Sequence, residues 1–567
     1  MNRQRWQICP PVPADIIAQR LQSVSSEREY ITLLIIQLLE NRGISNPTDF
    51  EPFLTADDRL AHAPRLLPDM DRAVTRMLRA LLGDELIAVY GDFDADGITG
   101  TVLLMEGISR LGGRVVHYIP HRLDEGHGLN LPALQGLKQQ GVSLVVTVDC
   151  GIGGGPEIKQ GLNLGLDFII TDHHEVPDSL PPALAAIDPK RADSTYPFCE
   201  LAGVGVALKL LQAVFEATNG NTDWEEYLDL VALGTVADMV PLGGENRYLV
   251  KRGIEVLNRS QRIGVQELVR CAGLQMGKLD EDSIGYMLGP RLNASGRMDH
   301  AVTSYELLMT TALEQARQLA AELESSNSER QRLTAEVYTN AREKLLLEGV
   351  DKPLLMIGEG SYPPGVVGVV AGKLANEFYR PTIVLQFDGE QARGSARSIP
   401  EFDILGALTE CKALLTRFGG HRQAAGFIAL KANVEKLHWQ LQQIAARELA
   451  DVDLRPAINI DAEIPIATVD AAMYKSISKL APFGQGNQIP TFLSRKVRVL
   501  ESRRVGATGD HLKLKLRNNR VVWDAIAFNQ GNRETSSYID IVYNLEQEDW
   551  NGRRLLRLNI VDFLPSL

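Results

Sequence analysis

Four short apolar runs alternate with amphipathic stretches between residues 85 and 174, and this alternation predicts a parallel sheet covered by helices on both faces. The strands are expected at 85–91, 115–120, 143–151 and 166–174. Helical patterns lie between them at 98–113, 131–141 and 156–165, and further helices are expected over 203–260. Sheets of this kind bind ligands beyond the carboxyl ends of their strands.

The pattern changes several times along the chain, which predicts a multidomain α/β protein with a C-terminal β-barrel. One or two long helices with charged outer faces are expected from about residue 300, and two-residue alternation near the C-terminus is typical of exposed antiparallel strands. The expected parts are a helical segment at 1–80, a parallel-sheet domain at 81–300, connector helices at 301–347, a second α/β domain at 348–450 and the barrel at 455–567.

Composition adds information on the environment. The length of 567 residues suits roughly three to four domains. No apolar run approaches the roughly 20 residues of a membrane helix, and the N-terminus has no apolar signal segment. The five cysteines form no CxxC pair, which argues against structural zinc and disulfides and favours a reducing cytoplasm. The net charge of −13 disfavours nucleic acid on average, but binding depends on the local field.

The first candidate for chemistry is the sequence GDFDADG, directly after the strand at 85–91. It brings Asp92, Asp94 and Asp96 within five residues, and like charges this close are costly unless cations lie between them. A calcium loop is the alternative, but no helix precedes the motif and Leu103 stands where the bidentate Glu belongs. By itself the motif is as consistent with a solvated acidic loop as with catalysis.

Two more polar clusters end strands of the same predicted sheet. Asp149 ends the strand at 143–151, and Asp172, His173 and His174 end the strand at 166–174. Asp149 alone is also typical of a turn, whereas two adjacent histidines after an apolar strand do not suit a core. Their common placement at one edge predicts a single site. Asp238, at the end of a helical stretch, is unremarkable by itself.

Carboxylates with one or two imidazoles suit Mn²⁺ or Mg²⁺ better than zinc or copper. Such a set predicts two ions about 3.5–4 Å apart that activate water and stabilise a phosphoryl group. The sequence therefore predicts a metal-dependent phosphoesterase.

Basic residues gather within the predicted barrel. They are Arg495, Lys496, Arg498, Arg503, Arg504, Lys513, Lys515, Arg517 and Arg520, opposed only by Glu501 and Asp510. A barrel with such a surface is suited to track a phosphate backbone, with Lys513 and Lys515 as candidate contacts. A basic solvated face is the alternative. His511, Trp523 and Phe528 are candidates for base stacking, although Trp523 and Phe528 also suit a core.

The motifs GDFDADG, VTVDCG, TDHH and GTVADMVPL, in this order, resemble the DHH phosphoesterase superfamily. The resemblance extends over nearly the whole chain to the bacterial RecJ single-stranded-DNA exonucleases. It includes PHRLDEGHG at 120–128, GPRLNASGR at 289–297, GSARS at 394–398, FGGHRQAAGF at 418–427 and APFGQGNQIP at 481–490. It implies a DHH domain, a DHHA1 domain at 348–450 and an OB-fold barrel.

The resemblance also implies roles for individual residues. The implied metal residues are Asp92, Asp94, Asp96, Asp149, His173 and Asp238, and Asp172 and His174 complete the catalytic set, with His174 as a candidate contact to the scissile phosphate. The implied DNA or phosphate contacts are Arg122, Arg291, Asn293, Arg297, Gly394, Ser395, Arg397, Ser398, Gly420 and His421. Glycines in GSARS and FGGH would let backbone amides approach an anion, although each is also typical of a tight turn.

The chain departs from the family at two positions. Tyr90 stands where many members have a histidine, two residues before Asp92, which would alter the shell of the first ion. Tyr362 and Pro363 replace a Trp-His pair, and no polar contact is expected there.

The expected function is hydrolysis of single-stranded DNA by a metal-activated water. The resemblance implies the 5′→3′ direction, the release of nucleotides and a role in repair and recombination. The alternatives are a DHH enzyme for small substrates, such as an oligoribonucleotide or cyclic dinucleotide, and an inactive replication scaffold. From the family we expect single-strand-binding protein and a RecQ-like helicase as partners of a cytoplasmic monomer.

Overall fold

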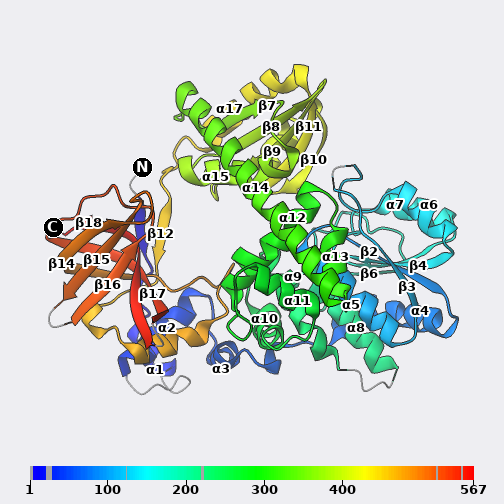
Figure 1. The fold of residues 1–567 in the computed structure, drawn as a ribbon, viewed down its shortest axis with the longest axis horizontal. Coiled ribbons are helices and arrows are strands. Elements are labelled where there is room, and N and C mark those ends of the chain that lie inside the picture. The colour runs from blue at the N-terminus through cyan, green and yellow to red at the C-terminus, as the bar shows by residue number, and fades with distance from the viewer. Residues whose placement is uncertain are drawn as a thin grey trace. The chain divides into compact units, whose positions relative to one another are not determined.

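A computed structural model describes residues 4–20, 29–122, 124–218, 223–518, 521–550 and 553–566 (Figure 1). The chain forms two compact units. The larger contains Gln4–Gly289, Leu308–Thr311 and Ala457–Leu567, and the smaller contains Pro290–Leu307 and Ala312–Pro456. Within the described residues no helix is both long and apolar enough to span a bilayer.

The centre of the larger unit is a five-stranded parallel sheet in the order β3-β2-β4-β5-β6. Its strands are β2 (Leu86–Gly91), β3 (Arg114–Tyr118), β4 (Val142–Val148), β5 (Asp167–Thr171) and β6 (Ala185–Ile187). The four predicted strands are present. The fifth, β6, has three residues, too few to leave a pattern in the sequence.

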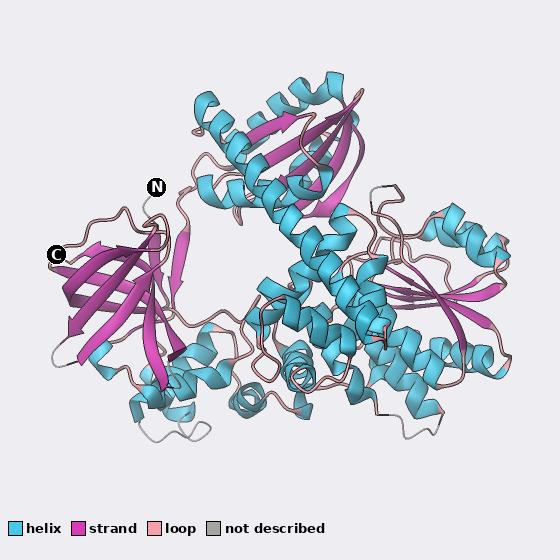
Figure 2. Cartoon of the chain, viewed as in Figure 1, coloured by secondary structure: helices cyan, strands magenta, loops and turns pink. Residues whose placement is uncertain are grey.

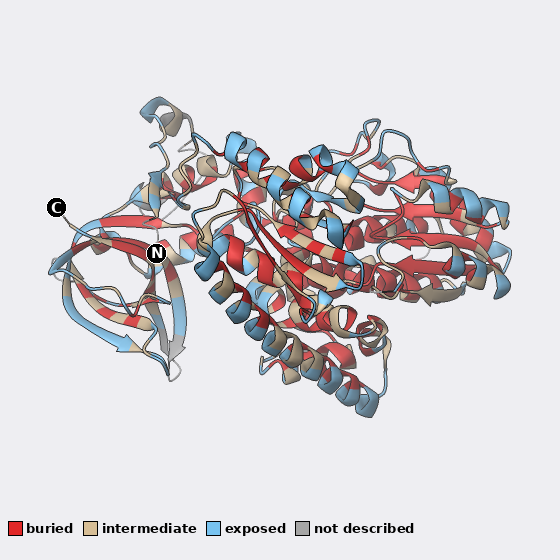
Figure 3. Cartoon of the chain, turned by 90° about the horizontal axis from the view of Figure 1, so that it is seen from above, coloured by how far each residue is buried: buried red, intermediate tan, exposed pale blue. Residues whose placement is uncertain are grey.

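Helices cover both faces of this sheet, as the alternation predicted. One face packs against α4 (Met70–Leu82), α5 (Ala95–Arg110) and α8 (Gly203–Ala217), and the other against α6 (Leu131–Gln139) and α7 (Gly155–Asn163). Figure 3 shows the strands as buried and the outer sides of the helices as exposed. The unit continues through α9 (Leu228–Ala237), α10 (Gly244–Leu257), α11 (Ile263–Cys271) and the π-helix η4 (Ser283–Leu288).

The C-terminal part of the larger unit is a closed barrel. Its strands are β14 (Phe492–Val505), β15 (His511–Asn518), β16 (Val521–Ala527), β17 (Tyr538–Trp550) and β18 (Arg553–Pro565), with the short β13 (Ala462–Glu463) beside β14. The barrel closes because β14 pairs with both β15 and β17. Helix α18 (Ala471–Ile477) precedes it.

The N-terminal segment shares its core with the barrel. It contains β1 (Arg5–Ile8), α1 (Ala14–Arg20), α2 (Glu29–Asn41) and α3 (Pro47–Thr55). Apolar residues of α2 and α3 lie in one cluster with those of β14–β18. Strand β1, in a segment predicted to be mostly helical, pairs in parallel with β12 (Ala457–Ile460), a partner that the local sequence does not reveal.

The smaller unit contains the predicted connector and the second α/β fold (Figure 2). Helices α12 (Gly289–Met298), α13 (Val302–Met309) and the 36-residue α14 (Leu313–Glu348) lead into the sheet β10-β11-β9-β8-β7. The strands are β7 (Leu355–Glu359), β8 (Thr382–Asp388), β9 (Gln391–Arg397), β10 (Leu415–His421) and β11 (Ala424–Leu430), and the helices are α15 (Pro364–Phe378), α16 (Ile404–Glu410) and α17 (Val434–Glu448).

Arg247, on α10, is fully buried and connects three segments of the larger unit. Its guanidinium donates to the carbonyl of Phe53 at 2.6 Å and stacks on that ring at 4.0 Å. It also donates to the carbonyls of Leu480 at 2.7 Å and Ala481 at 2.8 Å. The charge thus satisfies carbonyls that would otherwise be buried without donors.

We predict that Arg247→Met destabilises the larger unit by at least about 3 kcal/mol, because each orphaned buried carbonyl costs about 1–3 kcal/mol. The matched control is Arg252→Met on the same helix, whose partly exposed ion pairs with Glu225 and Glu255 are worth about 0–1 kcal/mol. Urea unfolding measures both, and an equal loss in the two variants would contradict the prediction.

Candidate metal centre

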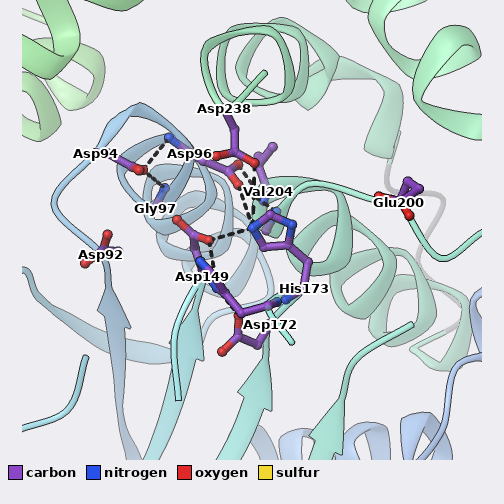
Figure 4. A network of polar contacts seen from close by, with 12 residues as sticks. Asp92, Asp94, Asp96, Gly97, Asp149, Asp172, His173, Glu200, Val204 and Asp238 are labelled. Atoms are coloured by element: carbon purple, nitrogen blue, oxygen red, sulfur yellow. Dashed lines mark hydrogen bonds and ion pairs between the residues drawn. The ribbon is translucent and has the colours of Figure 1, made fainter. Parts of the chain in front are cut away.

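Three of the predicted clusters meet beyond the carboxyl ends of β2, β4 and β5 (Figure 4). Asp92 and Asp94 follow β2, Asp149 follows β4, and His173 follows β5. Asp238 joins them from the C-terminal end of α9. The positions that the sequence pattern placed at one sheet edge therefore lie around a common space, together with the aspartate that the pattern alone did not select.

The ligand atoms form overlapping groups. Asp92, Asp94 and Asp149 offer oxygens within 4.8 Å of one another, as do the ligand atoms of Asp96, His173 and Asp238. The Nε2 atom of His173 lies 3.1 Å from Oδ1 of Asp149 and 3.6 Å from Oδ2 of Asp238. Asp149 also forms a third group with His173 and His174, and so connects the other two.

Helix N-termini hold two of the carboxylates in place. Asp94 caps α5, where its Oδ1 accepts from the amides of Asp96 at 3.0 Å and Gly97 at 3.2 Å. Asp96 accepts from the amides of Gly203 at 2.7 Å and Val204 at 2.8 Å at the start of α8. Backbone amides at a helix N-terminus stabilise negative charge, so both side chains are fixed without a cationic residue.

The backbone is crowded around the cluster. Asp149 has a φ of 60°, in the left-handed region that non-glycine residues rarely adopt. A Cβ on Gly97 would lie 2.6 Å from the amide nitrogen of Asp92, and one on Gly203 would lie 2.6 Å from Cβ of Asp149. Strain of this kind is held at functional sites by the surrounding packing.

Asp172 orients the histidines and is not among the grouped ligand atoms. Its Oδ2 accepts from the amide of Ile152 at 2.9 Å, and its Oδ1 accepts from the amide of His173 at 2.8 Å and lies 2.8 Å from Nδ1 of His174. Burial alone raises the pKa of Asp172, but the contact with His174 brings it to about 2. Burial lowers the pKa of His174, yet Asp172 raises it to about 9 overall.

Burial dominates the electrostatics of the other groups. It raises the pKa of Asp96 to about 7 and that of Asp238 to about 9, and neighbouring carboxylates act in the same direction. Burial also raises the pKa of Asp92 and Asp149 well above the usual range. It lowers the pKa of His173 to about 4, so that this imidazole is neutral at pH 7 and has a lone pair to offer.

The donor set fits divalent cations. Both carboxylate oxygens of Asp92, Oδ1 of Asp149 and Nε2 of His173 are buried without a hydrogen-bond partner. Buried polar atoms without partners are rare unless an ion or water satisfies them. Oxygen ligands with a neutral imidazole are suited to Mn²⁺ or Mg²⁺.

Family models match three parts of the chain: the DHH family, N-terminal domain, over 86–235, the DHHA1 domain over 351–447, and the RecJ OB domain over 460–562. The single-stranded-DNA-specific exonuclease RecJ of Bacillus subtilis (strain 168) is 37% identical, covering 100% of this chain and 71% of the relative. The RecJ of Dickeya dadantii (strain 3937) is 31% identical, covering 97% of this chain and 100% of the relative. The chain belongs to the RecJ family.

RecJ structures share the fold. RecJ from Thermus thermophilus in complex with Mn²⁺ matches with a TM-score of 0.86 and 27% identity, covering 100% of this chain and 80% of that one. The same protein with Mg²⁺ matches with a TM-score of 0.80 and 26% identity, over 100% and 79% of the two chains. The predicted family and fold class are confirmed, and the ions in these relatives are the two that the donor set indicates.

Of the contacts expected from RecJ, Arg122 lies near the metal cluster. Its guanidinium stacks on the Phe93 ring at 4.9 Å, and the carboxylates of Asp92 and Asp94 act on it electrostatically. Burial lowers the pKa of Arg122, yet the group remains cationic at neutral pH.

In the smaller unit the expected contacts have varied surroundings. Ser395 and Arg397 lie on one face of β9 beside α15, where a Cβ on Gly368 would be 3.2 Å from the hydroxyl and 3.1 Å from the guanidinium. Gly394 faces the ring of Phe427, which leaves no room for a side chain. A glycine is therefore required here for packing, and the expected approach of its backbone to an anion stays a prediction.

The remaining expected residues of this unit lie on α12 and near the hairpin β10–β11. Arg291 donates to Glu324 at 2.6 Å, and Asn293 and Arg297 lie on the same helix α12. Ser398 donates to the carbonyl of Phe402 at 2.8 Å. Gly420 has a φ of 140° and precedes His421 at the end of β10.

On the barrel, Leu512, Leu514 and Leu516 point inward, and Lys513 and Lys515 alternate with them. Trp523 is 8% exposed and belongs to the core, whereas Phe528 is exposed and contacts His511 edge-on. Arg520 lies outside the described residues.

Sequence reasoning missed two features. His127, in the loop PHRLDEGHG, places Nε2 3.3 Å from Oδ2 of Asp92, and only its position in a motif loop signalled it. The second is the hydroxyl of Tyr362, which donates to Asn340 within the smaller unit at 2.6 Å, while the absence of a contact from Tyr362 to a bound strand stays a prediction.

The raised pKa values predict a pH-dependent stability of the metal-free protein. A group whose pKa is raised by folding contributes stability that is lost as the pH rises through the folded value. Asp238 and His174, each with a pKa of about 9, therefore lower the melting temperature from pH 7 to pH 9 in EDTA, whereas Asp96, with a pKa of about 7, acts mainly below pH 7.

Excess Mg²⁺ should remove the decline of the melting temperature with rising pH, because the ion binds the deprotonated ligands. Asp238→Asn should flatten the decline and raise the melting temperature in EDTA at pH 8. A melting temperature independent of pH in EDTA would contradict the assignment of these pKa shifts.

Proposed function

We propose that this protein is a metal-dependent exonuclease that hydrolyses single-stranded DNA from the 5′ end and releases nucleotides in DNA repair and recombination. The observation that carries the proposal is the buried cluster of carboxylates and imidazole with partnerless ligand atoms, in a chain that belongs to the RecJ family. The direction of digestion follows from that family membership.

We assign Asp92, Asp94 and Asp149 to one ion, and Asp96, Asp149, His173 and Asp238 to the other. When bound, such ions lower the pKa of water and offset charge on a phosphoryl oxygen. Asp172 fixes the imidazole of His174 through its Nδ1 and holds the backbone of His173 through its amide. His174, which is protonated at pH 7, is placed to donate to the scissile phosphate.

DNA contacts are proposed on both units. Arg122 offers a cation beside the metal cluster, and Ser395 and Arg397 present a hydroxyl and a guanidinium from one strand face. On the barrel, Lys513 lies directly opposite Arg503, a like-charge pair that is unfavourable unless an anion lies over it. The further contacts proposed are Arg291, Asn293, Arg297, Gly394, Ser398, Gly420, His421 and Lys515.

The two alternatives have less support. An enzyme for small substrates has no evident use for a basic barrel, and this chain matches the RecJ OB domain over 460–562. An inactive scaffold has no need of partnerless buried carboxylates, which destabilise a protein that binds no ion. The domain boundaries given above, a monomeric state, a cytoplasmic location, single-strand-binding protein and a RecQ-like helicase remain part of the proposal.

The test is digestion of 5′- and 3′-labelled single strands and of blunt duplex with Mn²⁺. We expect early release of label from the 5′ end of single strands and little attack on duplex. Asp149→Ala removes the carboxylate shared by both ions. It should lower the cleavage rate by several orders of magnitude and leave strand binding intact. Full activity in that variant would refute the metal-site assignment, and equal attack on blunt duplex would refute strand specificity.

The barrel contacts can be tested by the salt dependence of strand binding. Each phosphate contact contributes a slope of about −0.7 when the logarithm of the affinity for single strands is plotted against the logarithm of the salt concentration. The double variant Lys513→Glu/Lys515→Glu should therefore flatten the slope by up to about 1.4, which is two such contacts. Lys475→Glu/Lys479→Glu, on the helical segment before the barrel, changes the net charge equally and should leave the slope nearly unchanged.

A further inference from the structure

The imidazole of His127 lies close to Asp92 and is not among the metal ligands proposed above. His127 Nε2 lies 3.3 Å from Oδ2 of Asp92, an oxygen that is buried and has no hydrogen-bond partner. The side chain of His127 is 55% exposed, whereas that of Asp92 is fully buried. His127 therefore lies between the buried carboxylate and solvent.

This spacing suits two ligands of one ion. Neighbouring ligands in an octahedral shell with arms of about 2.1 Å are about 3.0 Å apart. In the other group, His173 Nε2 lies 3.1 Å from Oδ1 of Asp149. The His127–Asp92 distance is thus comparable to that between two residues already assigned to an ion.

The loop that carries His127 is fixed by Tyr90. The Tyr90 hydroxyl donates to the carbonyl of Gly128 at 3.1 Å and accepts from Nδ2 of Asn130 at 3.1 Å. The other amide atom of Asn130 caps α6 by accepting from the amide of Ala133 at 2.8 Å, which sets the orientation of this amide. The Tyr90 hydroxyl is therefore engaged with the loop and does not serve as a ligand.

The backbone and a ring contact complete the placement of His127. Gly126 and Gly128, on either side, have φ values of 79° and 83°, so the chain turns sharply both before and after the imidazole. The His127 ring also meets the Phe93 ring edge-on at 5.0 Å. These contacts hold the imidazole over Asp92.

We propose that His127 is a ligand of the ion held by Asp92, Asp94 and Asp149, and that Tyr90 positions the loop that presents it. Many family members have a histidine at the position of Tyr90. In this chain the imidazole comes instead from His127, in the loop that Tyr90 holds. The inference rests on the proposed two-ion site and adds a nitrogen ligand to its all-carboxylate group. Imidazole suits Mn²⁺ better than Mg²⁺, so His127 should favour Mn²⁺ at this position.

The test is calorimetric titration of the full-length protein with Mn²⁺ and, separately, with Mg²⁺, without DNA. Wild type should bind two Mn²⁺ ions. His127→Ala and His127→Gln should weaken one Mn²⁺ site at least about tenfold, leave the other unchanged, and weaken Mg²⁺ binding less. Tyr90→Phe should weaken the same site by a smaller factor.

His121→Ala is the matched control, because this histidine of the same loop lies 2.8 Å from Asp124. It should bind Mn²⁺ as wild type does, and thermal unfolding in EDTA should be unchanged in the His127 variants. Unchanged Mn²⁺ binding in His127→Ala would overturn the proposal, as would an equal loss for Mn²⁺ and Mg²⁺, which indicates a structural role. A wild type that binds two ions but does not cleave DNA would refute the proposed function alone.

Discussion

The candidate metal centre is organised around the burial of several carboxylates together at one end of a parallel sheet. Asp92, Asp96 and Asp149 are almost completely removed from water, which raises the pKa of each carboxyl, and neighbouring carboxylates raise these pKa values further. Backbone amides at the starts of two helices offset part of the cost of ionisation. The oxygens that remain without partners are the atoms that a cation satisfies, so affinity for ions arises from an arrangement that is unfavourable without them.

The close packing of these carboxylates restricts the conformation of the neighbouring backbone and the size of the residues beside it. Asp149 adopts a left-handed conformation, and Gly97 and Gly203 leave no room for a methyl group against the acidic residues. Asp172 serves the site without joining the grouped ligand atoms, because its oxygens are occupied by amides and by His174. The residues that shape the site are therefore as specific as those that would bind the ions.

The sequence was most informative where one physical rule governs many residues. Apolar runs separated by helical patterns predicted the parallel sheet, and the rule that ligands bind at strand ends brought Asp92, Asp149 and His173 together. Asp238 came only from the family resemblance, because a helix end has no comparable rule. His127 was missed because its contact depends on how a loop folds back, which the periodicity of the chain does not encode. Strand β1 pairs with β12, more than four hundred residues away, and local patterns carry no information on such a partner.

The core shared by the N-terminal segment and the barrel has a consequence for synthesis. Ile36, Leu38 and Phe50 share a buried cluster with residues of β14–β18, so these partners are made more than four hundred residues later. At about 5–20 residues per second, a ribosome needs on the order of 25–90 s to reach those strands after the first helices emerge. The apolar face of α2 stays without its native cover throughout that interval. The nascent chain thus carries an aggregation-prone apolar surface until the strands of the barrel emerge.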